Sequence, residues 1–539
     1  MDALLITTAF VFGFTVKQFG LPPLVGFLAA GFALNIFGVE TTEILHQLSE
    51  IGIILLLFSI GLKVNIKRLL APQILGTASL HMIISVAVFG AVVYGFSLAG
   101  LSFFRKLDLT TSLLIAFALS FSSTVFAVKI LEEKKEMSSK HGRLAIGILV
   151  MQDLFAVIFI TLTSGKIPSV LSLGLFGLFF LRKPLLALMD RSGHGELLVL
   201  LACILPVAGA GVFEYVGLKP DLGALLLGML LAGYPKSDEL AKAMFGFKDM
   251  FLVGFFLTIG MAELPNIEML GSALLLVVFI PLKVALFFIL FTKFSLRART
   301  SLLTSMNLAN YSEFGLIVGA VGVRQGWIGG EWLVIIAVAL SISMIVASPV
   351  ANFTPRIYSR WNSLFRKFET RTRLPGDDIV DIGAATIAVF GMGRVGTGVY
   401  DNLRRRYGKQ VIGLDYDEER IQLHVKEGRK VIYGDAADYD FWQRKITTSR
   451  QINSVFLTMS HTANIAAAQS ISEFRNVSTL AATVRYNDEV TPLKKAGVDL
   501  VFDIYDEAGS GFSNHVCELV TAKGNTSMGE AMPGSNMDP

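Results

Sequence analysis

The sequence predicts an all-α polytopic membrane domain of about 13 transmembrane helices, followed by a cytoplasmic α/β Rossmann-like domain. Of the 539 residues, 53% are hydrophobic and only 17% are charged, and the mean hydropathy is +0.60. This composition is more apolar than the core of a soluble protein requires. Towards the carboxyl end, the long apolar segments give way to short apolar runs that alternate with helix-length amphipathic stretches, which predicts parallel strands joined by crossover helices.

The membrane domain is predicted to cover residues 1–353. A helix needs ~20 residues to cross ~30 Å of hydrocarbon, and thirteen segments approach that length. The loops between them alternate between rich and poor in lysine and arginine, so the positive-inside rule places the amino terminus outside and the carboxyl terminus inside. The predicted spans are 3–19, 22–38, 48–62, 74–99, 109–131, 143–163, 169–189, 197–218, 221–235, 247–262, 269–293, 300–323 and 330–353.

Charge and cysteine usage exclude several classes of function. The net charge is +4, but the basic residues occur in short clusters between apolar segments, so we expect no nucleic-acid partner. Cys203 and Cys517 lie far apart and have no metal-ligand spacing. His424, His515 and the pair Ser460-His461 have no evident acid or nucleophile partner in the sequence, and we therefore expect no enzymatic activity.

Three further segments follow the last span. Residues 354–378 are polar and basic and form a juxtamembrane linker, whose cations either contact anionic lipid headgroups or form a solvated helix face. Residues 379–523 form the Rossmann-like domain, and residues 524–539, rich in Gly, Ser, Met and Asn, are predicted to be disordered. The predicted strands are Ile387–Phe390, Val411–Leu414, Val431–Tyr433 and Val455–Leu457.

A glycine-rich motif follows the first of these strands and opens a helix. Glycines in such a turn allow close backbone approach to a phosphate, and the helix amino terminus offers unpaired N–H groups to the anion. Asp415 ends the next strand, at the spacing at which a carboxylate reaches a ribose hydroxyl. The alternatives are a scaffold that has lost its ligand and, for Gly434-Asp435-Ala436, a simple turn. The predicted nucleotide-binding residues are Gly391, Met392, Gly393, Arg394, Val395, Gly396, Asp415, Asp435 and Ala436.

Through these motifs, residues from about Ala385 to Val520 resemble the regulator-of-potassium-conductance, or TrkA-type, domains. The resemblance implies a regulatory ligand, NAD(H) or an adenine nucleotide such as AMP or ATP. It also implies a dimeric gate.

In the membrane domain, polar residues at a common depth mark the predicted ion site. Ionisable groups inside apolar spans cost several kcal/mol and commonly mark a transport pathway. Asp153 lies near the middle of its span, and the surrounding amide and hydroxyl oxygens suit a partly dehydrated monovalent cation. The alternative is a structural salt bridge between Asp153 and Lys283. The predicted ion- and proton-binding residues are Asp153, Gln152, Ser122, Ser123, Thr124, Asn310, Ser312, Glu313 and Lys283, with the cation at Asp153.

These residues carry a resemblance of nearly the whole chain to the second monovalent cation:proton antiporter family and its Kef-type branch. The resemblance implies inverted repeats with two crossed discontinuous helices, a homodimer, and an elevator-like movement of the core in a bacterial inner membrane. It predicts exchange of potassium for protons with Asp153 as the shared carboxylate, gated by nucleotide. The matching segments are Ser49–Gly52, Leu57–Leu62, Gly142–Asp153, Phe255–Met261, Lys283 and Ser312–Phe314.

Alternatives from other classes remain open. A nucleotide-gated potassium channel would need a selectivity-filter motif, which the sequence lacks, and a membrane-anchored redox enzyme would need haem, flavin or quinone signatures. A sodium/proton antiporter is equally compatible with the ion site. The sequence also leaves open the nucleotide and its effect, the stoichiometry, glutathione regulation and an ancillary regulatory subunit.

Overall fold

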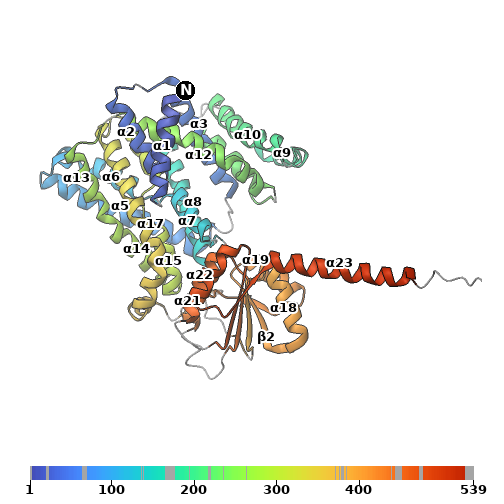
Figure 1. The fold of residues 1–539 in the computed structure, drawn as a ribbon. Coiled ribbons are helices and arrows are strands. Elements are labelled where there is room, and N and C mark those ends of the chain that lie inside the picture. Colours follow the sequence, from blue (N-terminus) through green and yellow to red (C-terminus); the bar gives the residue numbers. More distant parts are fainter. Residues whose placement is uncertain are drawn as a thin grey trace, which may run out of the picture. The chain divides into compact units, whose positions relative to one another are not determined.

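The computed structural model describes residues 3–528 except 20–22, 40, 64–68, 135, 138, 164–176, 194, 217–219, 235, 263, 371, 375–376, 378–381, 384, 439, 443–451 and 473–476. The chain divides into two compact units (Figure 1). The membrane unit comprises Met1–Glu132 and Lys140–Asp377, and the carboxyl-terminal unit comprises Glu133–Ser139 and Asp378–Pro539.

The membrane unit contains two groups of helices. In the first group, α3 packs on α11 and α12, α2 packs on α1 and α12, and α10 packs on α11. The backbones approach closely at pairs of glycines: a Cβ on Gly61 would lie 2.3 Å from the carbonyl oxygen of Leu225, and one on Gly260 would lie 2.5 Å from that of Leu28. Such small-residue contacts are the usual means by which membrane helices pack. The helices are α1 (Ala3–Gln18), α2 (Pro23–Ile36), α3 (Glu43–Lys63), α9 (Leu178–Arg191), α10 (Glu196–Tyr215), α11 (Pro220–Leu231) and α12 (Ser237–Ala262).

The second group repeats one pattern twice: a long helical span, a broken span and a further long helix. The first broken span consists of α6 (Leu109–Ser120) and α7 (Thr124–Glu133), and the second of α15 (Ala298–Asn307) and α16 (Glu313–Arg324). Both interruptions fall where the predicted discontinuous helices place them. The remaining members are α5 (Pro72–Leu98), the 3-10 helix η1 (Ser102–Lys106), α8 (Lys140–Thr163), α13 (Ile267–Val277), α14 (Phe279–Lys293) and α17 (Glu331–Phe365).

The number of spans stays a prediction. Among the described residues, six helical segments are long and apolar enough to cross a membrane, and three shorter apolar helices accompany them. The last helix, α17, continues to Phe365, well beyond the predicted end of the final span at residue 353, and its backbone leaves helical geometry at Trp361. The 3-10 helix η3 (Arg366–Phe368) follows directly.

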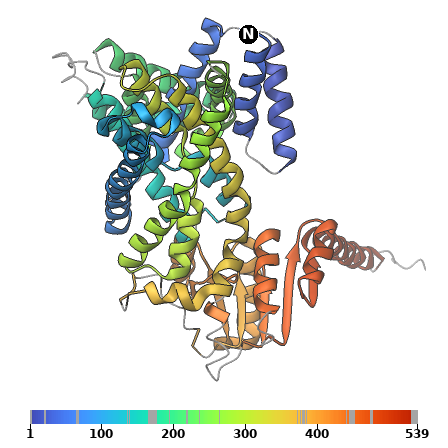
Figure 2. The same cartoon turned by 90° about the vertical axis from the view of Figure 1, so that its left-hand side faces the viewer.

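The carboxyl-terminal unit is a six-stranded parallel sheet in the order β3-β2-β1-β4-β5-β6. Strands of this sheet are drawn as orange arrows in Figure 2. The predicted strands are found with nearly the same bounds, because strands of a parallel sheet covered on both faces read as continuous apolar runs. The strands are β1 (Ile387–Phe390), β2 (Val411–Asp415), β3 (Val431–Tyr433), β4 (Ser454–Leu457), β5 (Thr479–Val484) and β6 (Leu500–Asp503).

Helices join these strands as the α/β pattern predicts. One apolar cluster packs Tyr400 of α18 against the sheet, and another packs Ala467 of α21 against the sheet. The final helix, α23, covers residues 524–528, which the sequence assigned to the tail, while residues 529–539 of that tail lie outside the described residues. The helices are α18 (Arg394–Tyr407), α19 (Glu418–Lys426), α21 (His461–Ser472), α22 (Val490–Lys495) and α23 (Ile504–Met528), with short 3-10 helices η4 (Gly408–Gln410) and η5 (Asn487–Glu489).

Candidate functional site

The two helix breaks of the membrane unit touch each other. Ser122 donates from its Oγ to the carbonyl oxygen of Leu308 at 2.9 Å. Asn310 accepts at its Oδ1 from the backbone N–H of Ser123 at 2.6 Å. Each break therefore supplies hydrogen-bond partners that the other lacks inside the apolar unit, where unpaired backbone groups are costly.

Asp153 lies beside this crossing, on α8, and only 1% of its surface is exposed. Its Oδ2 accepts from Thr124 Oγ1 at 3.0 Å, at the first residue of the half-helix α7. Its Oδ1 has no hydrogen-bond partner among the described residues. Glu313, at the start of α16, is close enough to interact with it electrostatically. A buried oxygen without a partner marks a place for an ion, a water or a proton.

Gln152 supports the first break. Its Oε1 accepts from the Ser122 N–H at 3.0 Å, and its Nε2 donates to the Ser120 carbonyl at 3.2 Å. We expected Gln152 to offer a neutral oxygen to the ion, but here that oxygen already accepts one hydrogen bond from the backbone. The amide therefore fixes the backbone of the break next to Asp153.

Lys283 contacts carbonyl groups of both breaks. Its Nζ donates to the carbonyl oxygens of Phe121 at 2.6 Å and Asn310 at 2.8 Å, with Leu119 at 3.4 Å. The Tyr311 ring lies 5.3 Å from the same ammonium. The structure has no ion pair between Asp153 and Lys283, so the alternative of a structural salt bridge is wrong for this conformation. Lys283 instead places positive charge at the carboxyl end of the half-helix α6.

The last predicted members of the ion site lie at the start of α16. Ser312 caps this half-helix, since its Oγ accepts from the Phe314 N–H at 3.2 Å, and Glu313 is 1% exposed. The structure therefore brings all nine predicted residues to the crossing of the two breaks.

Sequence reasoning missed several polar residues around this crossing. Ser343 of α17 accepts from the Tyr311 N–H at 3.0 Å. On α5, His81 is fully buried and stacks on Phe287 with ring centroids 3.4 Å apart. Thr77, one turn before His81, is buried too. Polar residues four apart in an apolar span were the available signal.

In the carboxyl-terminal unit, the three glycines of the motif each meet a different steric requirement. Gly391 has φ +90°, which disfavours any side chain. A Cβ on Gly396 would lie 1.9 Å from the Gly391 carbonyl oxygen, so helix and turn can approach only without one. A Cβ on Gly393 would meet open space, at the N-cap of α18, where no side chain caps the helix. The free N–H groups and the open space fit a phosphate.

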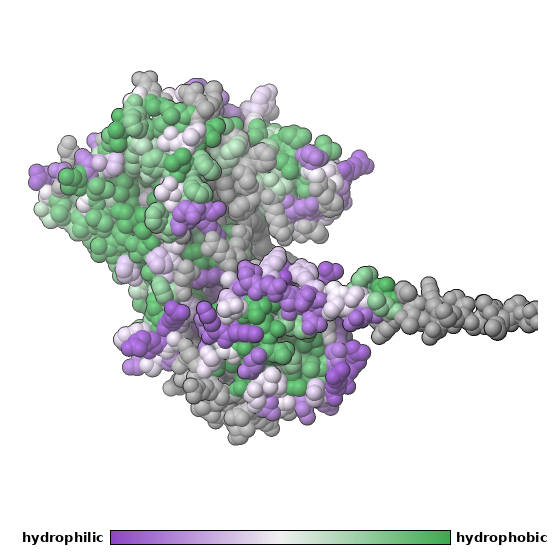
Figure 3. Space-filling view, viewed as in Figure 1, coloured by the Kyte–Doolittle hydropathy of each residue, from purple (hydrophilic) through white to green (hydrophobic). Residues whose placement is uncertain are grey.

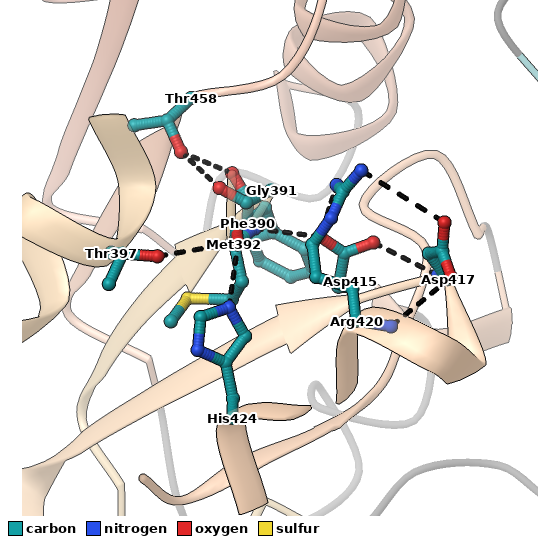
Figure 4. A network of polar contacts seen from close by, with 9 residues as sticks. All are labelled: Phe390, Gly391, Met392, Thr397, Asp415, Asp417, Arg420, His424 and Thr458. Carbon is teal, nitrogen blue, oxygen red and sulfur yellow. Dashed lines mark hydrogen bonds and ion pairs between the residues drawn. The ribbon is translucent and has the colours of Figure 1, made fainter. Parts of the chain in front are cut away.

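The predicted ribose-binding acid, Asp415, is almost completely buried in a hydrogen-bond network. Its Oδ2 accepts from the Met392 N–H at 2.8 Å and from Arg420 Nη1 at 3.0 Å, and its Oδ1 accepts from the Asp417 N–H at 2.9 Å (Figure 4). A ribose hydroxyl would therefore share this carboxylate with Arg420, which the sequence analysis did not identify. His424 also joins the network, because its Nε2 lies 2.8 Å from the Met392 carbonyl oxygen.

The remaining predicted contacts lie at the carboxyl ends of the neighbouring strands. Asp435 follows the end of β3. Its charge, the charge of Asp415 and burial together raise the pKa of the nearby Tyr416 hydroxyl to about 12. Ala436 is fully buried in the apolar core, so only its backbone could contact a ligand. Arg394 is exposed at the first position of α18, and Val395 is partly buried. The glycine turn itself lies between β1 and β4, where the strand order reverses and ligands of such sheets bind.

Comparison with known proteins assigns both units. Residues 5–354 match the family described as sodium/hydrogen exchanger, transmembrane. The chain belongs to this family. It is a multi-pass monovalent cation:proton antiporter, and residues 387–503 match the TrkA-N domain, so the two parts together are those of a Kef-type antiporter. The chain is 28% identical to a K(+) efflux antiporter named KefB from Alkalimonas amylolytica, covering 96% of this chain and 81% of that protein.

Further similarities cover one or both units. The chain is 26% identical to the glutathione-regulated potassium-efflux system protein KefC of Shigella flexneri, covering 89% of this chain and 79% of that protein. The sodium proton antiporter MjNhaP1 from Methanocaldococcus jannaschii aligns with 12% identity and a TM-score of 0.48, over 68% of this chain and 96% of that one. The TrkA-N domain of the inner membrane protein ybaL from Escherichia coli aligns with 19% identity and a TM-score of 0.22, over 25% and 98%.

Proposed function

We propose that this protein exchanges potassium for protons by alternating access, with Asp153 holding either the cation or a proton, and that a nucleotide bound to the carboxyl-terminal unit regulates the exchange. The observation that carries the proposal is the buried Oδ1 of Asp153, which has no partner among the described residues and lies at the crossing of the two broken helices.

The chemistry of exchange follows from this burial. A bare carboxylate in a low-dielectric interior is strongly disfavoured, so Asp153 crosses the membrane only when a proton or a cation neutralises it. Thr124 stays within reach of the bound species, while Lys283 offers donors only and cannot be a cation ligand. Because proton and cation compete for one oxygen, the movement of one requires the return of the other.

Alternating access is supported by how the membrane unit is built. All the predicted ion-site residues lie on α6 to α8 and α14 to α16 or in the breaks between them, within the second group of helices. The first group has its own apolar clusters, formed by α1 to α3 and α9 to α12. The second group can therefore shift against the first as one body and carry the ion site with it.

The cation and the location rest on separate observations. The relatives named above are potassium-efflux proteins, which favours potassium over sodium. The bacterial Kef relatives support a location in the inner membrane. The distribution of basic residues in the loops supports an amino terminus outside and a carboxyl-terminal unit in the cytoplasm.

A homodimer is supported by uncovered apolar surface in the carboxyl-terminal unit. A cavity of about 360 Å³ lies between α18 and the strands β4 to β6, lined by residues such as Val399, Phe456 and Phe502, and Figure 3 shows a hydrophobic patch on this unit. On α23, Tyr505 and Phe512 are 63% and 73% exposed. A second copy would cover such surfaces.

The decisive test is Asp153→Asn in proteoliposomes with separate potassium and sodium gradients. The variant keeps the size of the side chain and removes its charge, so we expect cation-driven proton flux to fall to the background of empty liposomes. Asp108→Asn is the matched control: Asp108 caps α6 by accepting from the Thr111 N–H at 2.7 Å, and asparagine caps equally well.

The outcomes separate the alternatives. Near wild-type exchange by Asp153→Asn would overturn the assignment and make Glu313 the next candidate carrier. Cation flux without coupled proton movement in the wild type would indicate a channel. A response to the sodium gradient alone would mean that the exchanged cation is sodium rather than potassium.

A further inference from the structure

A large apolar groove lies in the membrane unit, outside the crossing of the two helix breaks. It has a volume of about 810 Å³ and is walled by α13 and α14, by α15, by α17 and by residues 364–368. Several of its lining side chains are largely exposed, including Val278 (68%), Leu274 (54%) and Phe368 (49%). The α13–α14 side of the unit shows a continuous hydrophobic surface in Figure 3.

The helices themselves explain why the groove is open. Pro281 has no backbone N–H, so the carbonyl of Val277 loses its helical partner, and the span breaks between α13 and α14 at Val278. Beyond Trp361, where α17 leaves helical geometry, the chain packs Phe365 and Phe368 in T-shaped contacts on Phe288, at centroid distances of 5.5 and 5.7 Å. The groove therefore lies between a kinked span and the segment that follows α17.

The groove is long enough to cross one leaflet. From Leu274 to Ile289 the wall covers about 22 Å of helix at ~1.5 Å per residue, while the hydrocarbon of one leaflet is on the order of 15 Å thick. Phe365 and Phe368 contact Phe288, close to Lys293 at the end of α14, which puts residues 364–368 at the headgroup end of the groove.

The headgroup end of the groove is basic. Arg366 and Lys367 are exposed and lie in η3 between the lining residues Phe365 and Phe368. Within the part of the chain that the structure describes, neither makes an ion pair. Apolar walls that end in a pair of unpaired cations are complementary to acyl chains that end in an anionic headgroup.

We propose that this groove binds one anionic phospholipid, with its acyl chains between α14 and α17 and its headgroup on Arg366 and Lys367. A second copy of the chain is a poorer occupant, because a symmetric contact through this face would bring the same cations together. The groove wall also includes Ala309, directly before Asn310 of the ion site. Bound lipid thus supports the second helix break from outside.

Lipid binding is measured on the full-length protein, independently of transport. The purified protein is washed in detergent with phosphatidylglycerol and phosphatidylcholine, and retained lipid is counted by native mass spectrometry. We expect retention of phosphatidylglycerol over phosphatidylcholine. The double variant Arg366→Gln/Lys367→Gln should bind phosphatidylglycerol roughly 30-fold more weakly. Each basic side chain near an anionic surface contributes about 1 kcal/mol of binding free energy, and about 2 kcal/mol corresponds to roughly 30-fold in affinity.

A second variant tests the groove itself. Ala285→Trp places a large side chain at an exposed lining position, so it should displace phosphatidylglycerol while the helices keep their packing. The matched control, Lys183→Gln/Arg191→Gln, removes the same charge from exposed positions on α9. We expect it to retain lipid as the wild type does.

Three outcomes would overturn the proposal. The wild type could retain neither lipid selectively, or both groove variants could retain phosphatidylglycerol as well as the control does. Alternatively, Ala285→Trp could turn a dimer into a monomer without changing lipid retention, which would make the groove an interface between copies. Loss of lipid in both groove variants with normal retention in the control supports the site, whatever their transport activity.

Discussion

Replacing Lys283 by methionine tests whether this side chain supports the helix breaks or acts as the partner of the ion. Methionine keeps most of the apolar stem and removes the ammonium, which leaves the carbonyls of Phe121 and Asn310 without their short contacts at 2.6 and 2.8 Å. A hydrogen bond to a charged group contributes about 1.5–3 kcal/mol. Two such bonds give about 3–6 kcal/mol. Removing the ammonium also removes the free-energy cost of burying it, so we expect a net destabilisation of about 3 kcal/mol.

The assay is thermal unfolding of the purified protein followed by cation binding. A loss of about 3 kcal/mol corresponds to a fall in Tm of roughly 5 °C in a unit of this size. Lys293→Met, which removes an exposed lysine from the last turn of the same helix, is the control and should leave Tm nearly unchanged. Cation binding should survive in Lys283→Met, because Asp153 keeps its contact with Thr124, while turnover should fall as the breaks lose their support.

Two results would refute this reasoning. If Lys283→Met had a wild-type Tm and full transport, the three carbonyl contacts would have no energetic importance. If its Tm were unchanged but cation binding were lost, Lys283 would act on the charge of Asp153 rather than on the backbone.

Two further predictions concern the carboxyl-terminal unit and the linker. Gly393→Asp places a carboxylate where phosphate would bind, so calorimetry on the full-length protein should show lost affinity for NADH, NAD, AMP or ATP. Gly398→Asp, at an exposed open position on the same helix, should bind the nucleotide normally. Equal binding by both variants would exclude this site. Burial raises the pKa of Asp377, although the Arg297 N–H and the Thr300 hydroxyl donate to it. A raised pKa in the folded protein contributes stability that is present near pH 3.8, the ordinary pKa, and is lost as the pH rises through the pKa of the folded state. The Tm of the wild type relative to Asp377→Asn should therefore be higher at pH 4 than at pH 8. The opposite trend would contradict this assignment.

The positions of the secondary structure could be read from the sequence because apolar runs determine both kinds of element. Buried parallel strands such as Ile387–Phe390 are continuous apolar runs, and the strand has the predicted bounds in the structure. The end of α17 could not be read in this way. Hydropathy reports only the part in hydrocarbon, whereas the helix continues to Phe365. Its extension is held by Tyr358 and Phe365, which pack in one apolar cluster with Phe288.

The residues that meet at the crossing of the two helix breaks were predictable from the sequence, but their contacts were not. Asp153, Lys283 and Glu313 stand out because charge is rare in apolar spans. Their hydrogen-bond partners do not stand out in the sequence, because Lys283 donates to backbone carbonyls, and every residue has a backbone carbonyl whatever its side chain. Gln152 likewise bonds to backbone groups. The alternative of an Asp153–Lys283 bridge rested on side-chain charge alone, and the structure does not form it.

This difference in pairing bears on the coupling ratio. Had Lys283 been bonded to Asp153, an arriving cation would have to displace an ammonium, and the lysine could release a proton of its own. Because Lys283 donates to the carbonyls of Phe121 and Asn310, we expect its charge to stay with the helix ends during exchange. Glu313 lies close to Asp153, and repulsion disfavours two bare charges there at once. The two carboxylates then carry one negative charge that a single potassium or a single proton neutralises. We therefore predict that one cation exchanges for one proton and that the exchange does not respond to an imposed membrane potential.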